Sequence, residues 1–76
     1  MHPRIEVNPN ILSGKPVIRG TRIPVEAIVR KLGDGATIAE VLDDFPRLTE
    51  EDIRAALSFA ADSLSTDEIV PLVDAE

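Results

Sequence analysis

The amino-acid sequence predicts a mainly α-helical single domain that begins with a short β segment. Apolar residues recur at helical spacing in three successive stretches, near residues 24–34, 37–45 and 49–64. Residues 4–23 instead contain β-branched residues separated by Gly, Pro and Asn, a pattern typical of short strands and turns. We therefore expect one domain over residues 1–65, followed by a C-terminal tail over residues 66–76.

The predicted β segment starts at residues 4–7, where polar and apolar residues alternate as in a short strand. Asn8-Pro9-Asn10 then breaks this strand. Further β-branched residues, at 17–18 and at 23, flank Gly20-Thr21. They indicate short extended pieces that form a bulged ribbon.

The first two predicted helices have recognisable ends. Pro24 suits the start of the first helix, and Gly33 and Gly35 are expected to end it. Thr37 is expected to cap the second helix, and Glu40, three residues later, completes a capping box. Both signals come from residue types that favour helix termini, so they support the two predicted helices independently of the apolar spacing.

The apolar positions of each stretch fall on one face of a helix, and such a face is expected to pack against the other helices. They are Val25, Ile28, Val29 and Leu32 in the first, Ile38, Val41, Leu42 and Phe45 in the second, and Ile53, Ala56, Leu57, Ala60, Ala61 and Leu64 in the third.

The connection between the second and third helices is short. Pro46 ends the second helix, and Thr49 is expected to cap the third, whose first turn holds the acids Glu50, Glu51 and Asp52. A turn of three or four residues between short helices has the spacing of a helix-turn-helix. Any three-helix bundle can use such a turn, so the turn does not by itself indicate DNA binding.

The composition leaves this small chain few means of stabilising a core. It has 76 residues, no Cys and a single His, so neither a disulfide nor a thiolate metal site is available. Small scaffolds of this kind usually need a partner chain instead, and we expect a homodimer. The sequence shows no signal-like or membrane-length apolar stretch, so we expect a cytoplasmic protein without a membrane partner.

The residue types needed for an active site are scarce, and we expect no enzyme. No Cys nucleophile is present, and the serines have no nearby histidine base. His2 is expected to be exposed and without a partner. Residues 14–21 depart from a phosphate-binding loop, which needs Gly-Lys-Ser/Thr at a helix start. We therefore expect no cofactor, no metal and no small-molecule substrate.

The net charge of −6 conceals an asymmetry along the chain. Residues 1–31 carry six Lys or Arg and two acids, whereas residues 32–76 carry two Lys or Arg and twelve acids. One interpretation is that the protein has two faces with different partners. The other is that these charges form an ordinary solvated surface.

Any nucleic-acid contact is expected in the basic N-terminal part. A DNA-binding helix-turn-helix reads bases with the first turn of its second helix, and here that turn carries three acids, which repel phosphates. The candidate nucleic-acid or dimer contacts are Lys15, Arg19, Arg22, Arg30 and Lys31. In the alternative interpretation, Arg19 and Arg22 tie the β segment to acids of a partner subunit.

The tail carries four apolar residues in a polar setting. The candidate protein-partner contacts are Ile69, Val70, Leu72 and Val73, and Pro71 between them opposes a continuing helix. These residues either fold back onto the chain or its twin subunit, or they bind a partner protein and become ordered on contact.

Several motifs resemble those of a widespread prokaryotic family. Residues 14–25 read Gly-Lys-Pro-Val-Ile-Arg-Gly-Thr-Arg-Ile-Pro-Val, and residues 35–42 and 45–53 carry further matching stretches. This pattern is similar to that of the family called domain of unknown function four-three-three. Its structural motif residues here are Gly14, Pro16, Gly20, Thr21 and Pro24, and the glycines and prolines suit turns and helix entry.

The resemblance implies a homeodomain-like helix-turn-helix fold and a role as an antitoxin. The antitoxin would resemble the VapB class, neutralise a PIN-like ribonuclease and repress its own operon. The family pattern offers no catalytic residues. Two alternatives stay open, which are a helix-turn-helix DNA-binding transcriptional regulator without a toxin partner and an adaptor that binds neither DNA nor toxin.

Overall fold

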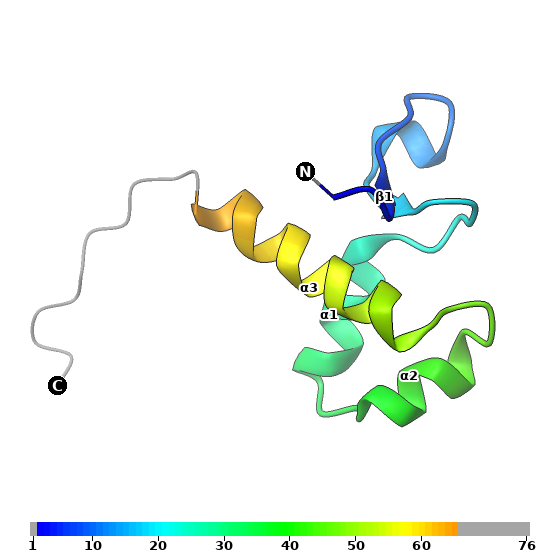
Figure 1. The fold of residues 1–76 in the computed structure, drawn as a ribbon, viewed down its shortest axis with the longest axis vertical. Coiled ribbons are helices and arrows are strands. Elements are labelled where there is room, and N and C mark those ends of the chain that lie inside the picture. Colours follow the sequence, from blue (N-terminus) through cyan, green and yellow to red (C-terminus); the bar gives the residue numbers. More distant parts are fainter. Residues whose placement is uncertain (1, 66–76) are drawn as a thin grey trace, which may run out of the picture.

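The computed structural model describes residues 2–65, which form three helices and a small two-stranded sheet (Figure 1). The elements in chain order are β1 (Ile5–Glu6), the 3-10 turn η1 (Leu12–Gly14), β2 (Val17–Ile18), α1 (Val25–Gly33), α2 (Ile38–Asp44) and α3 (Glu50–Ser65). The predicted mainly α-helical class, with a β segment before three helices, is confirmed. Within residues 2–65 no helix is long and apolar enough to cross a membrane.

The β segment is an antiparallel ribbon of two very short strands. Ile5 pairs with Ile18, and Glu6 pairs with Val17. Val17 also forms a bridge with Pro24, so the chain returns to the ribbon immediately before α1 begins. The ribbon therefore fixes where the first helix starts relative to the N-terminal strand.

Helices α2 and α3 both start with reciprocal hydrogen bonds between a side chain and the backbone. At α2 the Glu40 amide donates to Thr37 Oγ1 at 3.1 Å, and the Thr37 amide donates to Glu40 Oε1 at 2.8 Å. This is the predicted capping box. At α3 the Asp52 amide donates to Thr49 Oγ1 at 3.2 Å, and the Thr49 amide donates to Asp52 Oδ2 at 3.0 Å. The cap predicted at Thr49 is thus confirmed, with an aspartate as its partner.

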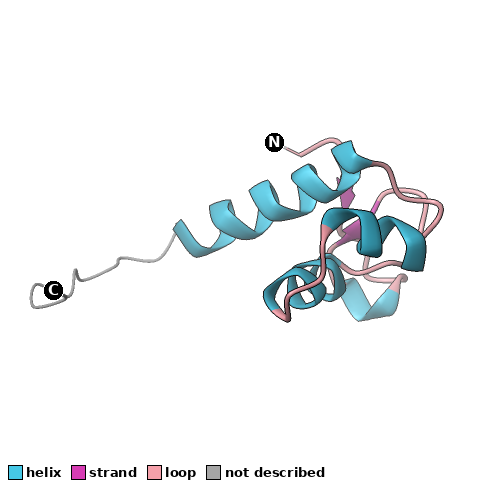
Figure 2. Cartoon of the chain, turned by 90° about the horizontal axis from the view of Figure 1, so that it is seen from below, coloured by secondary structure: helices cyan, strands magenta, loops and turns pink. Residues whose placement is uncertain are grey.

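The core is aliphatic and lies where the ribbon and the helices meet. Helix α3 packs along α1 and also contacts α2 and β1 (Figures 1 and 2). The side chains of Val17, Ile28, Val41 and Ile53 are fully buried. The other buried hydrophobic residues are Ile5, Ile18, Val25, Leu48 and Ala56. Each fully buried aliphatic side chain of this size stabilises the fold by roughly 1.5–3 kcal/mol.

The predicted apolar stripe of α3 is only partly buried. Ile53 is fully buried, but Leu57 is 40% exposed and Leu64 is 67% exposed, and Ala61 is exposed as well. The prediction that Leu57, Ala61 and Leu64 pack against the other helices is therefore wrong. The C-terminal half of α3 extends past the other helices (Figure 2), and it contacts the core through the neighbouring face that carries Phe59.

The N-terminal segment lies against α3. His2 Nε2 is 2.7 Å from Asp62 Oδ2, and the His2 ring meets the Phe59 ring edge-on, with centroids 5.5 Å apart. The prediction of an exposed His2 without a partner is therefore wrong. The cause is the ribbon pairing, which carries the N-terminus alongside a helix that is distant in sequence (Figure 1).

Candidate functional site

Arg4, the residue before β1, joins the ribbon to the start of α3. Its Nη1 lies 3.0 Å from Asp52 Oδ1, and its Nη2 lies 2.7 Å from Glu51 Oε1. Burial by itself raises the pKa of the Asp52 carboxyl. The Thr49 amide, the Arg4 guanidinium and the Thr49 side chain outweigh that effect and hold this pKa below its usual value. Asp52 is therefore an internal ion-pair partner, only 7% exposed.

All three acids in the first turn of α3 have an arginine partner. Glu51 and Asp52 share Arg4, and Glu50 Oε2 lies 3.2 Å from Arg54 Nη2. The sequence predicts that these acids repel a phosphate, and their ion pairs lower that repulsion. Because Arg4 belongs to the basic N-terminal part, that part lies against the acidic part instead of forming a wholly separate face.

Three of the five candidate basic residues pair with acids on or near α1. Lys15 Nζ lies 3.2 Å from Glu26 Oε1, and Arg30 Nη2 lies 3.9 Å from Glu26 Oε2. Lys31 Nζ lies 2.8 Å from Asp44 Oδ2, which joins α1 to the end of α2. Each of these three cations therefore has a carboxylate neighbour within the chain, and Lys15 and Arg30 share theirs.

The other two candidates, Arg19 and Arg22, have no carboxylate partner within residues 2–65. Arg19 donates from Nε to the Pro3 carbonyl oxygen at 2.7 Å and from Nη2 to the Ile5 carbonyl oxygen at 3.3 Å. Arg19 therefore holds the ribbon of its own chain through backbone carbonyls. Arg22 is exposed and lies at the edge of a hollow in the surface.

Gly14 and Gly20 take backbone conformations that favour glycine. Their φ angles are +88° and +82°, in the left-handed region that other residues adopt only at a cost. Gly20 lies in the turn after β2, where the Thr21 amide and the Thr21 hydroxyl both donate to the Ile18 carbonyl oxygen, at 2.9 and 2.7 Å. These three motif residues therefore shape the turns of the β segment.

Pro16 and Pro24 position the start of α1. The Val25 amide donates to the Pro16 carbonyl oxygen at 2.9 Å. Pro24 forms the bridge with Val17 and directly precedes the first residue of α1. Because proline fixes its own φ near the value that extended backbone and helix starts need, both residues set the direction in which α1 leaves the ribbon.

The turn after β2 meets the connection between α2 and α3 at a surface hollow of ≈ 350 Å³. Arg47, from the connection, donates from Nη2 to the Gly20 carbonyl oxygen at 3.1 Å and so joins the two segments. The hollow is lined by Glu6, Ile11, Gly20, Thr21, Arg22 and Arg47. Arg47 is absent from the predicted contacts, although it is one of only two Lys or Arg residues after residue 31.

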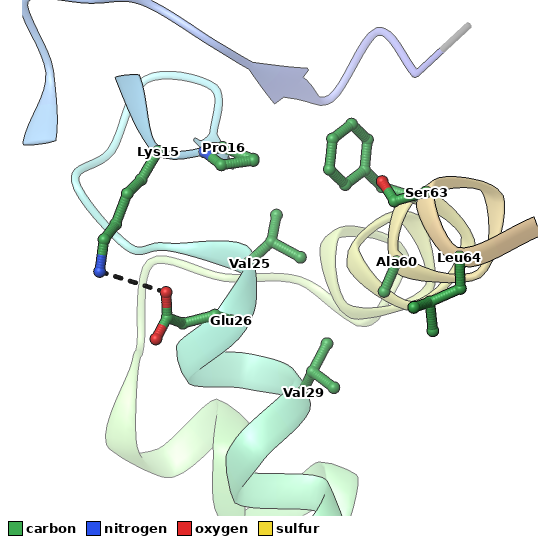
Figure 3. A pocket seen from close by; sticks show the side chains of 9 residues that line it. Lys15, Pro16, Val25, Glu26, Val29, Ala60, Ser63 and Leu64 are labelled. Atoms are coloured by element: carbon green, nitrogen blue, oxygen red, sulfur yellow. Dashed lines mark hydrogen bonds and ion pairs between the residues drawn. The ribbon is translucent and has the colours of Figure 1, made fainter. Parts of the chain in front are cut away.

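A second concavity, of ≈ 310 Å³, is an apolar groove between α1 and the C-terminal half of α3 (Figure 3). Val25 and Val29 of α1 lie on one side of it, and Leu64 of α3 lies on the other. The Lys15–Glu26 ion pair forms a polar edge. The remaining lining residues are Pro16, Phe59, Ala60 and Ser63.

The predicted protein-partner contacts Ile69, Val70, Leu72 and Val73 lie outside the described residues. Within residues 2–65 no group of three or more His, Asp or Glu side chains is arranged to hold a metal ion. The hollow at Arg22 and Arg47 and the groove between α1 and α3 are concave surfaces suited to binding.

The fold and these surfaces define a small domain of three packed helices, with an N-terminal β ribbon whose first strand, β1, contacts α3. The model of one family, described as protein of unknown function (DUF433), matches residues 5–60, which is most of the chain. The matched range includes the ribbon, the turns built by the motif residues, α1, α2 and α3 as far as Ala60. The chain belongs to the DUF433 family.

The chain also resembles two individual proteins. It is 40% identical over 53 residues to the uncharacterized protein y4eO of Sinorhizobium fredii (strain NBRC 101917 / NGR234), a match that covers 70% of this chain and 24% of that protein. A crystal structure of a DUF433 member protein from Anabaena variabilis ATCC 29413 is 35% identical, with a TM-score of 0.77, over 83% of this chain and 62% of that chain. This chain thus spans less than two thirds of the length of either relative.

Proposed function

We propose that this chain is the antitoxin of a type II toxin–antitoxin pair, which binds and neutralises a PIN-like ribonuclease in the cytoplasm. The observation that carries the proposal is an apolar face of α3, on which Leu57 and Leu64 lie two turns apart with the exposed Ala61 between them. Leu57 and Leu64 are 40% and 67% exposed, and Leu64 also lines the groove against α1. A contiguous apolar surface on a soluble domain is typical of a protein-binding site.

This apolar surface leads, along the chain, into the tail. Helix α3 ends at Ser65, and residues 66–76 carry four apolar contact candidates, four acids and no Lys or Arg. A ribonuclease that binds the RNA backbone needs a basic surface, and an acidic segment with apolar anchors complements such a surface. In this proposal α3 and the tail form one toxin-binding segment, and the chain itself catalyses no reaction.

Co-expression with the product of the adjacent reading frame tests the proposal. The wild-type chain is expected to restore growth of cells that express this product and to purify with it. The double variant Leu57→Asp/Leu64→Asp is expected to lose both effects. Val7→Asp is the matched control, since Val7 is 59% exposed but lies beside β1. If the wild-type chain neither binds the product nor restores growth, the antitoxin proposal is wrong.

We also propose that the chain works as a homodimer. Within residues 2–65 the core holds nine buried hydrophobic residues, none of them aromatic, which is little apolar surface for a domain to bury alone. Sedimentation velocity over a range of concentrations is expected to show a species with twice the mass of one chain. A monomer at every concentration would contradict the dimer.

A second candidate is a homeodomain-like helix-turn-helix regulator that binds DNA without a toxin partner. It is supported by the short connection, residues 45–49, between α2 and α3 and by the arginine partners of the acids at the start of α3. A mobility-shift assay with the DNA upstream of the chain's own gene tests this function. Sequence-specific binding is expected, and equal binding to a scrambled duplex would contradict it.

A further inference from the structure

Within residues 2–65 of this acidic chain, the basic residues that have no carboxylate partner lie close together. Five of the eight Lys and Arg residues form an ion pair with Asp or Glu within residues 2–65. The other three are Arg19, Arg22 and Arg47. They lie in the turn after β2 and in the connection before α3, which the Arg47–Gly20 hydrogen bond of 3.1 Å joins.

Arg22 and Arg47 both line the hollow between these two segments, and both have donors to spare. Arg22 makes no hydrogen bond or ion pair within residues 2–65. Arg47 uses Nη2 on a neutral carbonyl, and a guanidinium has five N–H donors in all. The space beside Gly20 is open, because no atom lies within 4 Å of the position that a Cβ at this residue would occupy.

One carboxylate, that of Glu6, also lines the hollow. Its single negative charge is set against the two guanidinium groups of Arg22 and Arg47, and Arg19 adds a third cation in the same turn. The Thr21 hydroxyl is already engaged, since it donates to Ile18 and accepts from the Ile23 amide. The hollow therefore keeps a net positive charge, and its spare donors come from arginine.

We propose that this hollow binds a phosphodiester group of duplex DNA through the guanidinium groups of Arg22 and Arg47. Guanidinium groups match phosphate oxygens with paired N–H donors. Duplex DNA is the partner because Arg47 lies just before α3, the helix whose first turn a helix-turn-helix places in the major groove, and phosphates line both edges of that groove. This inference rests on the helix-turn-helix geometry of the second candidate function, and it adds a backbone contact that is independent of base sequence.

Fluorescence anisotropy with a labelled duplex of mixed sequence, titrated with the full chain at several salt concentrations, tests the proposal. Arg22→Gln/Arg47→Gln is expected to bind on the order of tenfold more weakly than wild type, and its logarithmic salt slope is expected to fall by about 1 to 2. The matched control Arg30→Gln/Arg54→Gln removes the same two charges from arginines that have carboxylate partners. This control is expected to keep the wild-type slope.

Three results would overturn the proposal. They are no duplex binding by the wild-type chain at low salt, equal losses in the two double variants, and tighter binding to single-stranded RNA of the same length. Circular dichroism shows whether both variants fold. If the Arg22/Arg47 variant does not fold, Arg22→Gln alone, which breaks no bond within residues 2–65, is expected to lower the slope by about 1.

This experiment separates the hollow from the regulator function. A duplex of mixed sequence reports only on the phosphate contact, whereas the regulator function requires preference for one operator sequence. If the chain shows no preference for its operator but the Arg22/Arg47 variant still binds the duplex more weakly, the regulator function is refuted and the phosphate contact in the hollow is supported. If the chain prefers its operator but the Arg22/Arg47 variant binds as tightly as wild type, the phosphate contact is refuted and the regulator function is supported.

Discussion

Replacing Arg4 by Met removes the ion pairs that hold the ribbon to α3. The Arg4 side chain is 46% exposed, and its partners Asp52 and Glu51 are 11% and 68% exposed. A charged hydrogen bond to a mostly buried carboxylate contributes about 1.5–2 kcal/mol once the exposure of the arginine is considered. The exposed Glu51 pair adds about 0.2–0.5 kcal/mol. We expect Arg4→Met to lower the free energy of unfolding by about 2 kcal/mol in total.

Urea denaturation followed by circular dichroism, at one protein concentration, measures this loss. In a domain of this size a loss of about 2 kcal/mol corresponds to a decrease in Tm on the order of 10 °C. Arg54→Met is the matched control, because the Arg54–Glu50 pair is exposed on both sides and one turn apart, and such pairs contribute about 0.3–0.5 kcal/mol. Equal losses in the two variants would refute the role assigned to Arg4.

The same variant also changes the response to acid. The folded-state pKa of Asp52 lies below its usual value, so Asp52 contributes stability above its unfolded pKa of about 3.9. This contribution is lost as the pH falls through the lower folded-state pKa. Since Arg4 is one cause of the low pKa, the difference between wild type and Arg4→Met is expected to be smaller near pH 3 than at neutral pH. A constant difference would contradict this reasoning.

Three further predictions concern stability and use the same denaturation assay. Thr37→Ala breaks the capping box of α2 and is expected to cost about 1 kcal/mol, whereas no loss would show that the cap is dispensable. Gly20→Ala places a side chain at a φ of +82° and is expected to cost about 1 kcal/mol, while Gly33→Ala, in α1, is expected to be neutral or stabilising. Ile53→Ala, at a fully buried residue, is expected to cost about 2–5 kcal/mol. Leu57→Ala, at an exposed residue, is expected to cost less than about 1 kcal/mol. Similar losses in these two variants would mean that α3 turns a different face to the core.

The features that the sequence predicted correctly depend on neighbouring residues. The capping box joins Thr37 to Glu40, three residues away, and the cap of α3 joins Thr49 to Asp52 over the same distance. Helical spacing within one stretch also determines the existence of each helix. Such local signals are available in any single sequence, because they do not depend on how the elements pack.

The features that the sequence missed depend on residues that only the fold brings together. His2 and Asp62 are 60 positions apart, Arg4 and Asp52 are 48 apart, and the Arg47–Gly20 bond spans 27 positions. Composition shows which residues are polar or charged, but it does not show which of them become hydrogen-bond or ion-pair partners. Of the five basic candidates, Arg30 has a partner one helical turn away, whereas the partners of Lys15 and Lys31 are 11 and 13 positions away and follow only from the fold.

The length of α3 relative to its neighbours explains the remaining error. Its apolar residues continue to the end of the helix, so periodicity assigns Leu57 and Leu64 to the core. The helices beside it are shorter, and the outer half of α3 extends past them (Figure 2). These exposed residues are the ones on which the proposed toxin contact depends.

Titration of the purified ribonuclease from the adjacent gene with this chain tests the central claim most directly. The measured quantity is the rate of RNA cleavage as the chain is added. The antitoxin proposal predicts that cleavage stops when the chain reaches a fixed stoichiometric ratio, and that Leu57→Asp/Leu64→Asp shifts this point to a large excess. Undiminished cleavage in the presence of excess wild-type chain would contradict it.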